Sequence, residues 1–131
     1  MNKQIHVAAA IIYRNGQFLL SKRQSHQHQG GKWEFPGGKV ESGETVQQAL
    51  IRELKEEINI EVTTTSPFHS LKFDYPEKTV KLDFLLVSEF DGEEAGLEGQ
   101  EVSWFDKSEL LALTFPDANV PVLAKIRDEL K

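Results

Sequence analysis

The stretch that most constrains this chain covers residues 33–60, where a Pro-Gly-Gly sequence and a polar loop precede a glutamate-rich helical pattern. Leu50, Leu54 and Ile58 recur at helical spacing and form an apolar stripe. Three glutamates share the face beside that stripe: Glu53, Glu56 and Glu57. Like charges three or four residues apart on a helix cost about 0.2–0.5 kcal/mol per pair. The pattern therefore predicts an amphipathic helix with an acidic face that favours a cation.

This acidic face has two interpretations from its residues alone. Runs of like charge are usually solvated surface, and an ordinary surface helix would satisfy the pattern. The alternative is a divalent metal site, because Mg²⁺ takes carboxylate and carbonyl oxygens and keeps waters and substrate phosphates as its other ligands. Arg52, next to Glu53, can offset one carboxylate, whereas a divalent ion can offset all three.

The boundaries of the helix have their own signals. We expect Pro36-Gly37-Gly38 to form a turn, in which glycine permits torsions closed to other residues and lets a ligand approach the main chain. Thr45 and Gln48 have the spacing of a capping box, which predicts the helix start. Asn59 follows the predicted end of the helix, where a left-handed residue is common.

The rest of the chain alternates between short strands and loops. Strands are expected at residues 7–12, 18–20, 33–35, 60–64, 71–73, 79–89 and 102–105. Asn15-Gly16 predicts a hairpin turn between the first two. Loops are expected at residues 24–32, 74–78 and 91–100, a short helix capped by Asp106 at 107–111, and a last helix from about residue 120. This layout predicts one α/β domain with helices packed on a mixed sheet.

Length and charge limit the possible functions. A chain of 131 residues without cysteine can bury a core without disulfides and is compatible with a reducing cytoplasm, where we expect it. The longest apolar run near the N-terminus, residues 7–12, is too short to span a membrane. A net charge of −6 argues against binding a nucleic acid polymer, but a metal can still bridge acidic residues to a nucleoside triphosphate.

The spacing from Gly38 to Glu44, and from Glu44 to the segment at residues 52–60, resembles the Nudix hydrolase signature almost position for position. The family pattern has glycine where this chain has Asn59, a conservative change at a left-handed position. The resemblance continues through residues 73–78, 98–100 and 115–125, and it is to the Nudix enzymes that hydrolyse 8-oxo-dGTP. It implies a single Nudix domain over residues 1–131, with a mixed β-sheet sandwiched between α-helices. It also implies hydrolysis to the monophosphate and pyrophosphate, which protects DNA replication from mutation.

The same resemblance implies a metal site and its supporting residues. Mg²⁺, with Mn²⁺ as a substitute, would be held by the carbonyl of Gly37 and by four carboxylates: Glu53, Glu56, Glu57 and Glu98. Either Glu53 or Glu98 would take the proton from the attacking water, and the sequence does not separate them. The supporting residues would be Gly38, Lys39, Glu44 and Arg52. Among them, Arg52 would pair with Glu56 and Glu44 would hydrogen-bond within the loop.

Substrate contacts implied by the resemblance are spread over the chain. They comprise Arg23, His28, Glu34, Phe35, Pro36, Gly37, Tyr75, Lys78 and Asn119. Phe35 could instead be a strand residue that fills the core. Asn119 could instead cap the last helix.

Two other functions remain open at this point. A Nudix pyrophosphohydrolase for CTP or oxidised pyrimidine nucleotides would share the segment around Gly37 and Gly38. A non-catalytic domain that recognises oxidised guanine would be expected to lack the glutamates of the signature, which are present here. We expect a monomer that acts on a small nucleotide.

Overall fold

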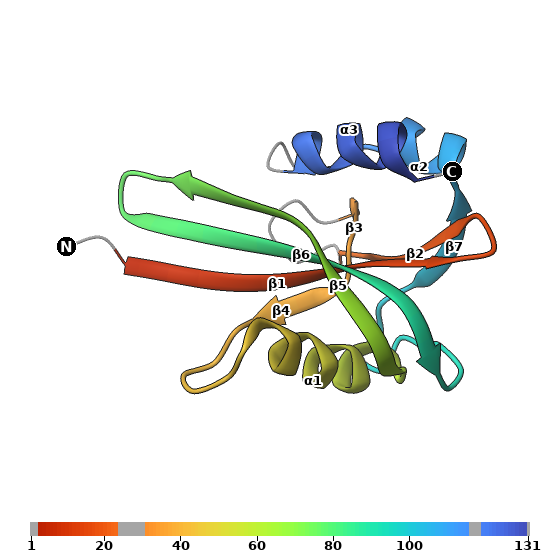
Figure 1. The fold of residues 1–131 in the computed structure, drawn as a ribbon, viewed down its shortest axis with the longest axis horizontal. Helices are drawn as coiled ribbons and strands as arrows, with labels where there is room; N and C mark the ends of the chain where they lie inside the picture. Colours follow the sequence, from red (N-terminus) through yellow and green to blue (C-terminus); the bar gives the residue numbers. More distant parts are fainter. Residues whose placement is uncertain (1–2, 24–30, 116–118, 131) are drawn as a thin grey trace.

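The computed structural model describes residues 3–23, 31–115 and 119–130 (Figure 1). Its elements in chain order are β1 (Lys3–Arg14), β2 (Gln17–Lys22), β3 (Trp33–Glu34), β4 (Gly37–Lys39), α1 (Val46–Ile58), β5 (Glu61–Asp74), β6 (Lys78–Asp91), β7 (Val102–Asp106), α2 (Lys107–Ala112) and α3 (Val120–Glu129). None of the helices in this part of the chain is long and apolar enough to cross a membrane.

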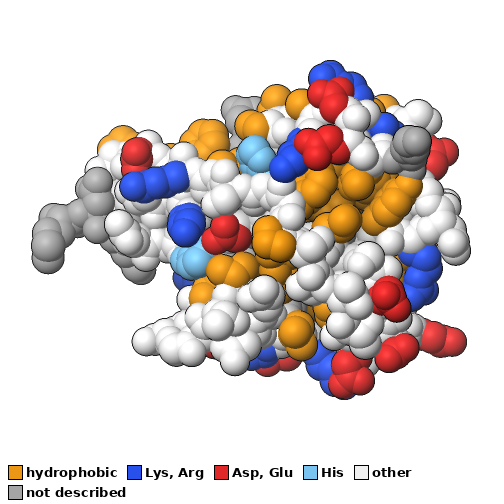
Figure 2. Space-filling model, viewed as in Figure 1, with side chains coloured by type: hydrophobic (Ala, Val, Ile, Leu, Met, Phe, Trp, Pro, Cys, Tyr) orange, Lys and Arg blue, Asp and Glu red, His pale blue; other side chains and the backbone are white. Residues whose placement is uncertain are grey.

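The strands form a mixed sheet in the order β3-β2-β1-β6-β5, with β4 paired to β1 and β7 paired to β2. β1 and β6 run parallel, while the other pairs are antiparallel. Helix α1 covers one face of the sheet, and α2 and α3 cover the other (Figure 1). Hydrophobic side chains are visible between these helical layers, with charged side chains around them (Figure 2). The predicted α/β sandwich is confirmed.

Strand β1 is apolar over residues 7–12 because both of its faces are covered. Ala8, Ala10 and Ile12 pack into the core on the side of α1. Ala9 and Ile11 point the other way, into the core on the side of α3. A strand buried on both faces loses the usual alternation of polar and apolar residues.

The local signals at the hairpin and at α1 hold in the structure. Asn15 and Gly16 have φ of 51° and 78°, as a two-residue hairpin of this twist requires. The Gln48 N–H donates to Thr45 Oγ1 at 3.1 Å, and the Thr45 N–H donates to Gln48 Oε1 at 2.9 Å. Asn59 ends α1 in the left-handed region with φ of 63°. The predicted capping box and left-handed end are confirmed.

Two predictions about elements were wrong. The strands expected at residues 60–64 and 71–73 are one strand, β5, which is kept continuous by its pairing with β6. Its register shifts at three places, one of them between Pro67 and His69, and proline is tolerated because β5 is an edge strand. The turn expected at Pro36-Gly37-Gly38 is instead the start of β4, and neither glycine has a positive φ.

Candidate active site

The two glycines of β4 are explained by close packing. Gly38 and Gly37 pair with Ala8 and Ala9 of β1. A Cβ on Gly37 would lie 2.0 Å from the Ala8 carbonyl oxygen, and a Cβ on Gly38 would lie 2.4 Å from Cδ of Glu53. The missing side chains therefore let β4 pack against β1 and let the carboxylate of Glu53 reach the main chain of β4.

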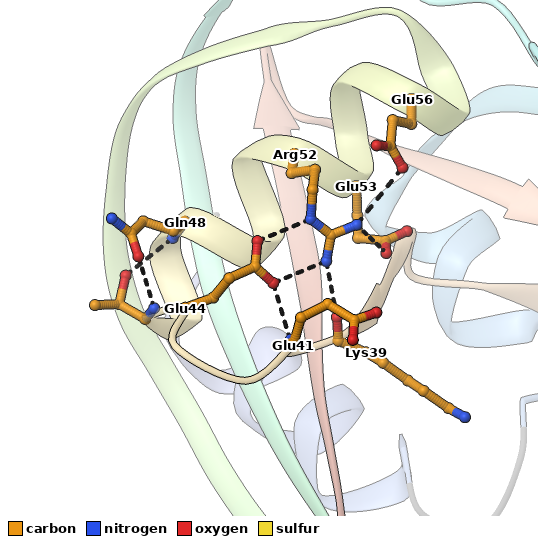
Figure 3. A network of polar contacts seen from close by, with 8 residues as sticks. Lys39, Glu41, Glu44, Gln48, Arg52, Glu53 and Glu56 are labelled. Atoms are coloured by element: carbon orange, nitrogen blue, oxygen red, sulfur yellow. Dashed lines mark hydrogen bonds and ion pairs between the residues drawn. The ribbon is translucent and has the colours of Figure 1, made fainter.

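Arg52 organises one side of the acidic helix (Figure 3). Its Nε and Nη2 donate to the two carboxylate oxygens of Glu44 at 2.8 and 2.9 Å. Its Nη1 donates to Glu53 Oε1 at 2.8 Å and lies 3.5 Å from Glu56 Oε2. The pairing predicted with Glu56 is present, but the contacts with Glu44 and Glu53 are shorter. Arg52 Nη2 also donates to the carbonyl of Lys39 at 3.1 Å, which ties the helix to β4.

Both carboxylate oxygens of Glu44 accept hydrogen bonds. Besides accepting from Arg52, its Oε1 accepts the N–H of Glu41 at 2.9 Å. Hydrogen bonds from Arg52 and then from the Glu41 N–H lower the pKa of Glu44 to about 2. The hydrogen bonding predicted for Glu44 within the loop is confirmed.

Glu57 lies in the opposite electrostatic environment. Burial, followed by the charges of Glu53, Glu98 and Glu34, raises its pKa to about 8. A hydrogen bond from the Gly37 N–H works in the other direction but does not outweigh these effects. Carboxylates from α1, from β3 and from the loop before β7 therefore act on one half-buried group.

Glu34 belongs to this acidic cluster, although its sequence position gave no sign of it. Burial raises the pKa of Glu34 against the opposing effect of Arg23, whose Nη1 donates to Glu34 Oε1 at 2.7 Å. The resemblance had placed both residues among the substrate contacts. No local pattern predicts the influence of Glu34 on Glu57, because it depends on packing β3 near the end of α1.

A cavity of about 400 Å³ lies beside the half-buried Glu57. Its lining consists of Val7, Ala8, Ala9, Arg23, Glu34, Phe35, Gly37, Gly38, Lys39 and Glu57. The structure thus brings predicted substrate residues together with a predicted metal ligand.

Phe35 has the core role considered for it and also borders the cavity, while its contact with the substrate base stays a prediction. Its exposed fraction is 6%, and its ring stacks on Phe115 with centroids 5.2 Å apart and meets Phe84 edge-on at 6.0 Å. It is therefore a core residue that also forms part of the cavity wall.

Of the remaining predicted substrate residues, those that the structure describes are not among the residues that line this cavity. Tyr75 and Lys78 lie at the hairpin between β5 and β6, where Lys78 Nζ is 5.8 Å from the centroid of the Tyr75 ring. Asn119 takes the N-cap position of α3, but its side chain makes no cap hydrogen bond. Pro36 precedes β4, and its carbonyl accepts the N–H of Ala10 at 2.8 Å. His28 lies outside the described residues.

The donor set suits a hard divalent cation. Across residues 3–23, 31–115 and 119–130, no three His, Asp or Glu side chains are already grouped around one point as a metal site. The chemistry still fits, because burial and then the charges of Glu53, Glu98 and Glu34 raise the pKa of Glu57. A divalent ion among carboxylate oxygens offsets such repulsion, and Mg²⁺ prefers those ligands.

Comparison with known proteins places the chain in a family. Residues 3–126 match the NUDIX domain model, and the chain therefore belongs to the Nudix family. It is 40% identical to the 8-oxo-dGTP diphosphatase of Escherichia coli (strain K12) over 126 residues, which cover 95% of this chain and 98% of that one. It is 39% identical to the CTP pyrophosphohydrolase of the same organism over 121 residues, covering 92% and 90% of the two chains.

The fold agrees with the sequence relatives. A solved structure from work on MutT of Aliivibrio salmonicida and Vibrio cholerae superposes with a TM-score of 0.86 at 42% sequence identity. The match covers 98% of this chain and 100% of that chain. The predicted membership of the Nudix family and the predicted fold are confirmed.

Proposed function

We propose that the protein is a divalent-metal-dependent pyrophosphohydrolase that converts 8-oxo-dGTP to the monophosphate and pyrophosphate. The observation that carries this proposal is the group of carboxylates around Glu57 beside a cavity lined by glycine main chain. The names of the 8-oxo-dGTP diphosphatases that align over nearly the whole chain support this choice of substrate. Such an activity would remove an oxidised nucleotide before DNA replication could incorporate it.

Five groups would hold the metal, namely the carbonyl of Gly37 and the carboxylates of Glu53, Glu56, Glu57 and Glu98. Mg²⁺, with Mn²⁺ as a substitute, would neutralise phosphate charge and make a bound water more acidic. Glu53 and Glu57 project from α1, and Glu98 lies in the loop after β6. Carboxylates would therefore enclose the metal-bound phosphates from two sides.

The chain itself supplies a positioned base. Hydrolysis of a phosphoanhydride needs charge neutralisation and an oriented water more than covalent participation by the protein. Glu53 suits the role of proton acceptor, because Arg52 fixes its carboxylate and the absence of a side chain on Gly38 leaves room for it. Glu98 is the alternative base. Arg23 lines the cavity and would face the phosphates or the sugar.

Asn119 is our candidate for reading the oxidised base. Oxidation at C8 puts a proton on N7, so the O6/N7 edge presents one acceptor and one donor in place of two acceptors. An asparagine amide complements that edge, with its NH₂ toward O6 and its carbonyl toward N7–H. Ordinary guanine would set two acceptors against each other, a mismatch of about 1–3 kcal/mol.

The substitution Asn119→Asp tests this assignment. Aspartate caps a helix about as well as asparagine but has no NH₂ for O6. We expect the variant to keep its melting temperature and its turnover of dGTP while losing most of its preference for 8-oxo-dGTP. Steady-state kinetics on both nucleotides measure this. A folded variant that prefers the oxidised nucleotide as strongly as the parent would mean that the base is read elsewhere.

Hydrolysis of CTP is the second candidate, because a CTP pyrophosphohydrolase aligns at nearly the same identity as the 8-oxo-dGTP diphosphatase. Release of pyrophosphate from 8-oxo-dGTP, dGTP, CTP and ADP-ribose under equal conditions separates the two functions. Our proposal requires the highest kcat/KM for 8-oxo-dGTP, and a higher value for CTP would overturn it.

A further inference from the structure

The loop that carries Glu98 is docked on the C-terminal end of α1. The last carbonyls of any helix lack partners within the helix and must find them elsewhere. Here the Leu97 N–H donates to the carbonyl of Glu57 and the Ala95 N–H donates to the carbonyl of Ile58, both at 2.9 Å. The loop thus completes the hydrogen bonding of the helical turn on which Glu57 stands.

One side chain joins the main chain of Glu98 to that of Glu57. Glu98 lies in a turn closed by the Gly99 N–H, which donates to the carbonyl of Gly96 at 3.2 Å. Gln100 folds back under this turn, and its Oε1 accepts the N–H of Glu98 at 2.9 Å. The other end of the same amide, Nε2, donates to the carbonyl of Glu57 at 3.0 Å.

The fit of this bridge is tight on both sides. An amide has one accepting and one donating end, and both ends of the Gln100 amide are used in the orientation that satisfies both partners. A Cβ on Gly96 would lie 1.8 Å from the Gln100 carbonyl oxygen and 3.2 Å from its Oε1. Glycine at position 96 therefore leaves the space that Gln100 occupies.

We infer that Gln100 is a positioning residue that holds Glu98 at a fixed place relative to Glu57. The inference rests on the proposed function, in which both glutamates hold the metal. Residues that orient metal ligands typically change metal affinity or activity by about 10–100-fold when they are removed. Gln100 acts through the main chain of the two ligands, so its loss displaces Glu98 without removing any carboxylate.

Asn59 provides a matched control at the other end of the same loop. Its Nδ2 donates to the carbonyl of Glu93 at 3.2 Å, and its φ of 63° is one that glycine adopts readily. Asn59→Gly therefore removes a contact between helix and loop, keeps the backbone conformation, and leaves the N–H of Glu98 untouched.

The experiment compares Gln100→Met, which has similar length and no amide, with Asn59→Gly. Gln100→Asn, whose amide is too short to reach both partners, serves as a second variant if the first does not fold. Calorimetric titration with Mn²⁺ alone and amide hydrogen exchange at Glu98 are measured on nucleotide-free protein. We expect Gln100→Met and Gln100→Asn to weaken Mn²⁺ binding by about 10-fold or more and to speed exchange of the Glu98 N–H. Asn59→Gly should change neither.

A double-mutant cycle distinguishes positioning from general loosening of the loop. If Gln100 acts through Glu98, its replacement should weaken Mn²⁺ binding much less in a Glu98→Gln background than in the parent. If the two substitutions weakened Mn²⁺ binding independently, so that their fold-changes multiplied in the double variant, the inference would be overturned. The inference would also be overturned if Gln100→Met bound Mn²⁺ as tightly as the parent and lost only as much melting temperature as Asn59→Gly. A parent that binds Mn²⁺ but does not hydrolyse 8-oxo-dGTP would refute the proposed function alone, because neither binding nor exchange uses the nucleotide.

Discussion

Glu44 and Glu57 lie on two sides of the same motif and have opposite electrostatic environments. Glu44 meets a guanidinium fork and a main-chain N–H, which lower its pKa to about 2. Glu57 is half-buried, and this burial, followed by the charges of neighbouring carboxylates, raises its pKa to about 8. Both are glutamates of one acidic segment, so residue type does not explain the difference. The placement of Arg52, which faces Glu44, Glu53 and Glu56 (Figure 3), and the burial of Glu57 explain it.

The difference distinguishes carboxylates that hold the fold together from carboxylates that remain available to bind a ligand. On the Arg52 side, hydrogen bonds fix the loop before α1 and one carboxylate oxygen of Glu53. On the Glu57 side, negative charges from separate segments are brought together at a cost to the folded protein. Such a cost is common where a protein binds a metal, because the bound ion offsets it. Glu53 links the two sides, since it contacts Arg52 and also raises the pKa of Glu57.

The largest effect is expected at this linking residue. Glu53→Gln keeps a hydrogen-bond acceptor for Arg52 but removes the base, and kcat should fall by roughly 10²–10⁴-fold with a much smaller change in KM. Steady-state kinetics on 8-oxo-dGTP measure both parameters. Glu98→Gln is the comparison. A mild loss in Glu53→Gln together with a severe one in Glu98→Gln would transfer the role of base to Glu98.

Metal binding should stabilise the Glu57 side of the motif, where the negative charges repel one another. Mg²⁺ at about 100 times its Kd should add about 2.7 kcal/mol to the free energy of unfolding, or roughly 10 °C in Tm. Glu57→Gln should raise the Tm of metal-free protein, because one repelled carboxylate is gone, and should reduce the gain from Mg²⁺. Thermal melts with EDTA and with Mg²⁺ measure both effects.

Glu61→Gln is the control for that experiment, since Glu61 is an exposed glutamate whose Oε1 lies 3.1 Å from Lys55 Nζ. It should leave the response to Mg²⁺ unchanged. Full hydrolytic activity in chelator-treated protein would contradict the assignment of the metal site.

The last expected effect is a difference in pH dependence between the two glutamates. Glu44 has a lowered pKa, so its contribution to stability is present above its unfolded pKa of about 4.5 and is lost as the pH falls toward about 2. Glu57 has a raised pKa, so metal-free protein should lose stability as the pH rises from about 4.5 to about 8. Urea denaturation in EDTA at pH 5 and pH 8 should show this loss in the parent and a weaker one in Glu57→Gln. If the free energy of unfolding fell by the same amount between pH 5 and pH 8 in both proteins, the raised pKa would belong to another group.

Local sequence patterns predicted several elements of the fold and their boundaries. The Asn15-Gly16 turn, the Thr45 capping box and the left-handed Asn59 each depend on residues close together in the chain, and each is present. The unbroken apolar run in β1 predicted a buried strand for the same reason. The pattern of β5 did not predict one continuous strand, because its continuity comes from pairing with β6.

The sequence by itself determined which residues of α1 share an acidic face, because helical periodicity fixes that relation. Only the tertiary structure decided that Glu57 is half-buried near Glu34 and Glu98, that Arg52 turns to Glu44, and that Gln100 bridges two glutamates. It also changed the reason for Gly37 and Gly38, which are needed for close packing against β1 and Glu53 and not for a turn. These features join segments that are distant in the chain, and their energies depend on burial and on charges that no single segment contains.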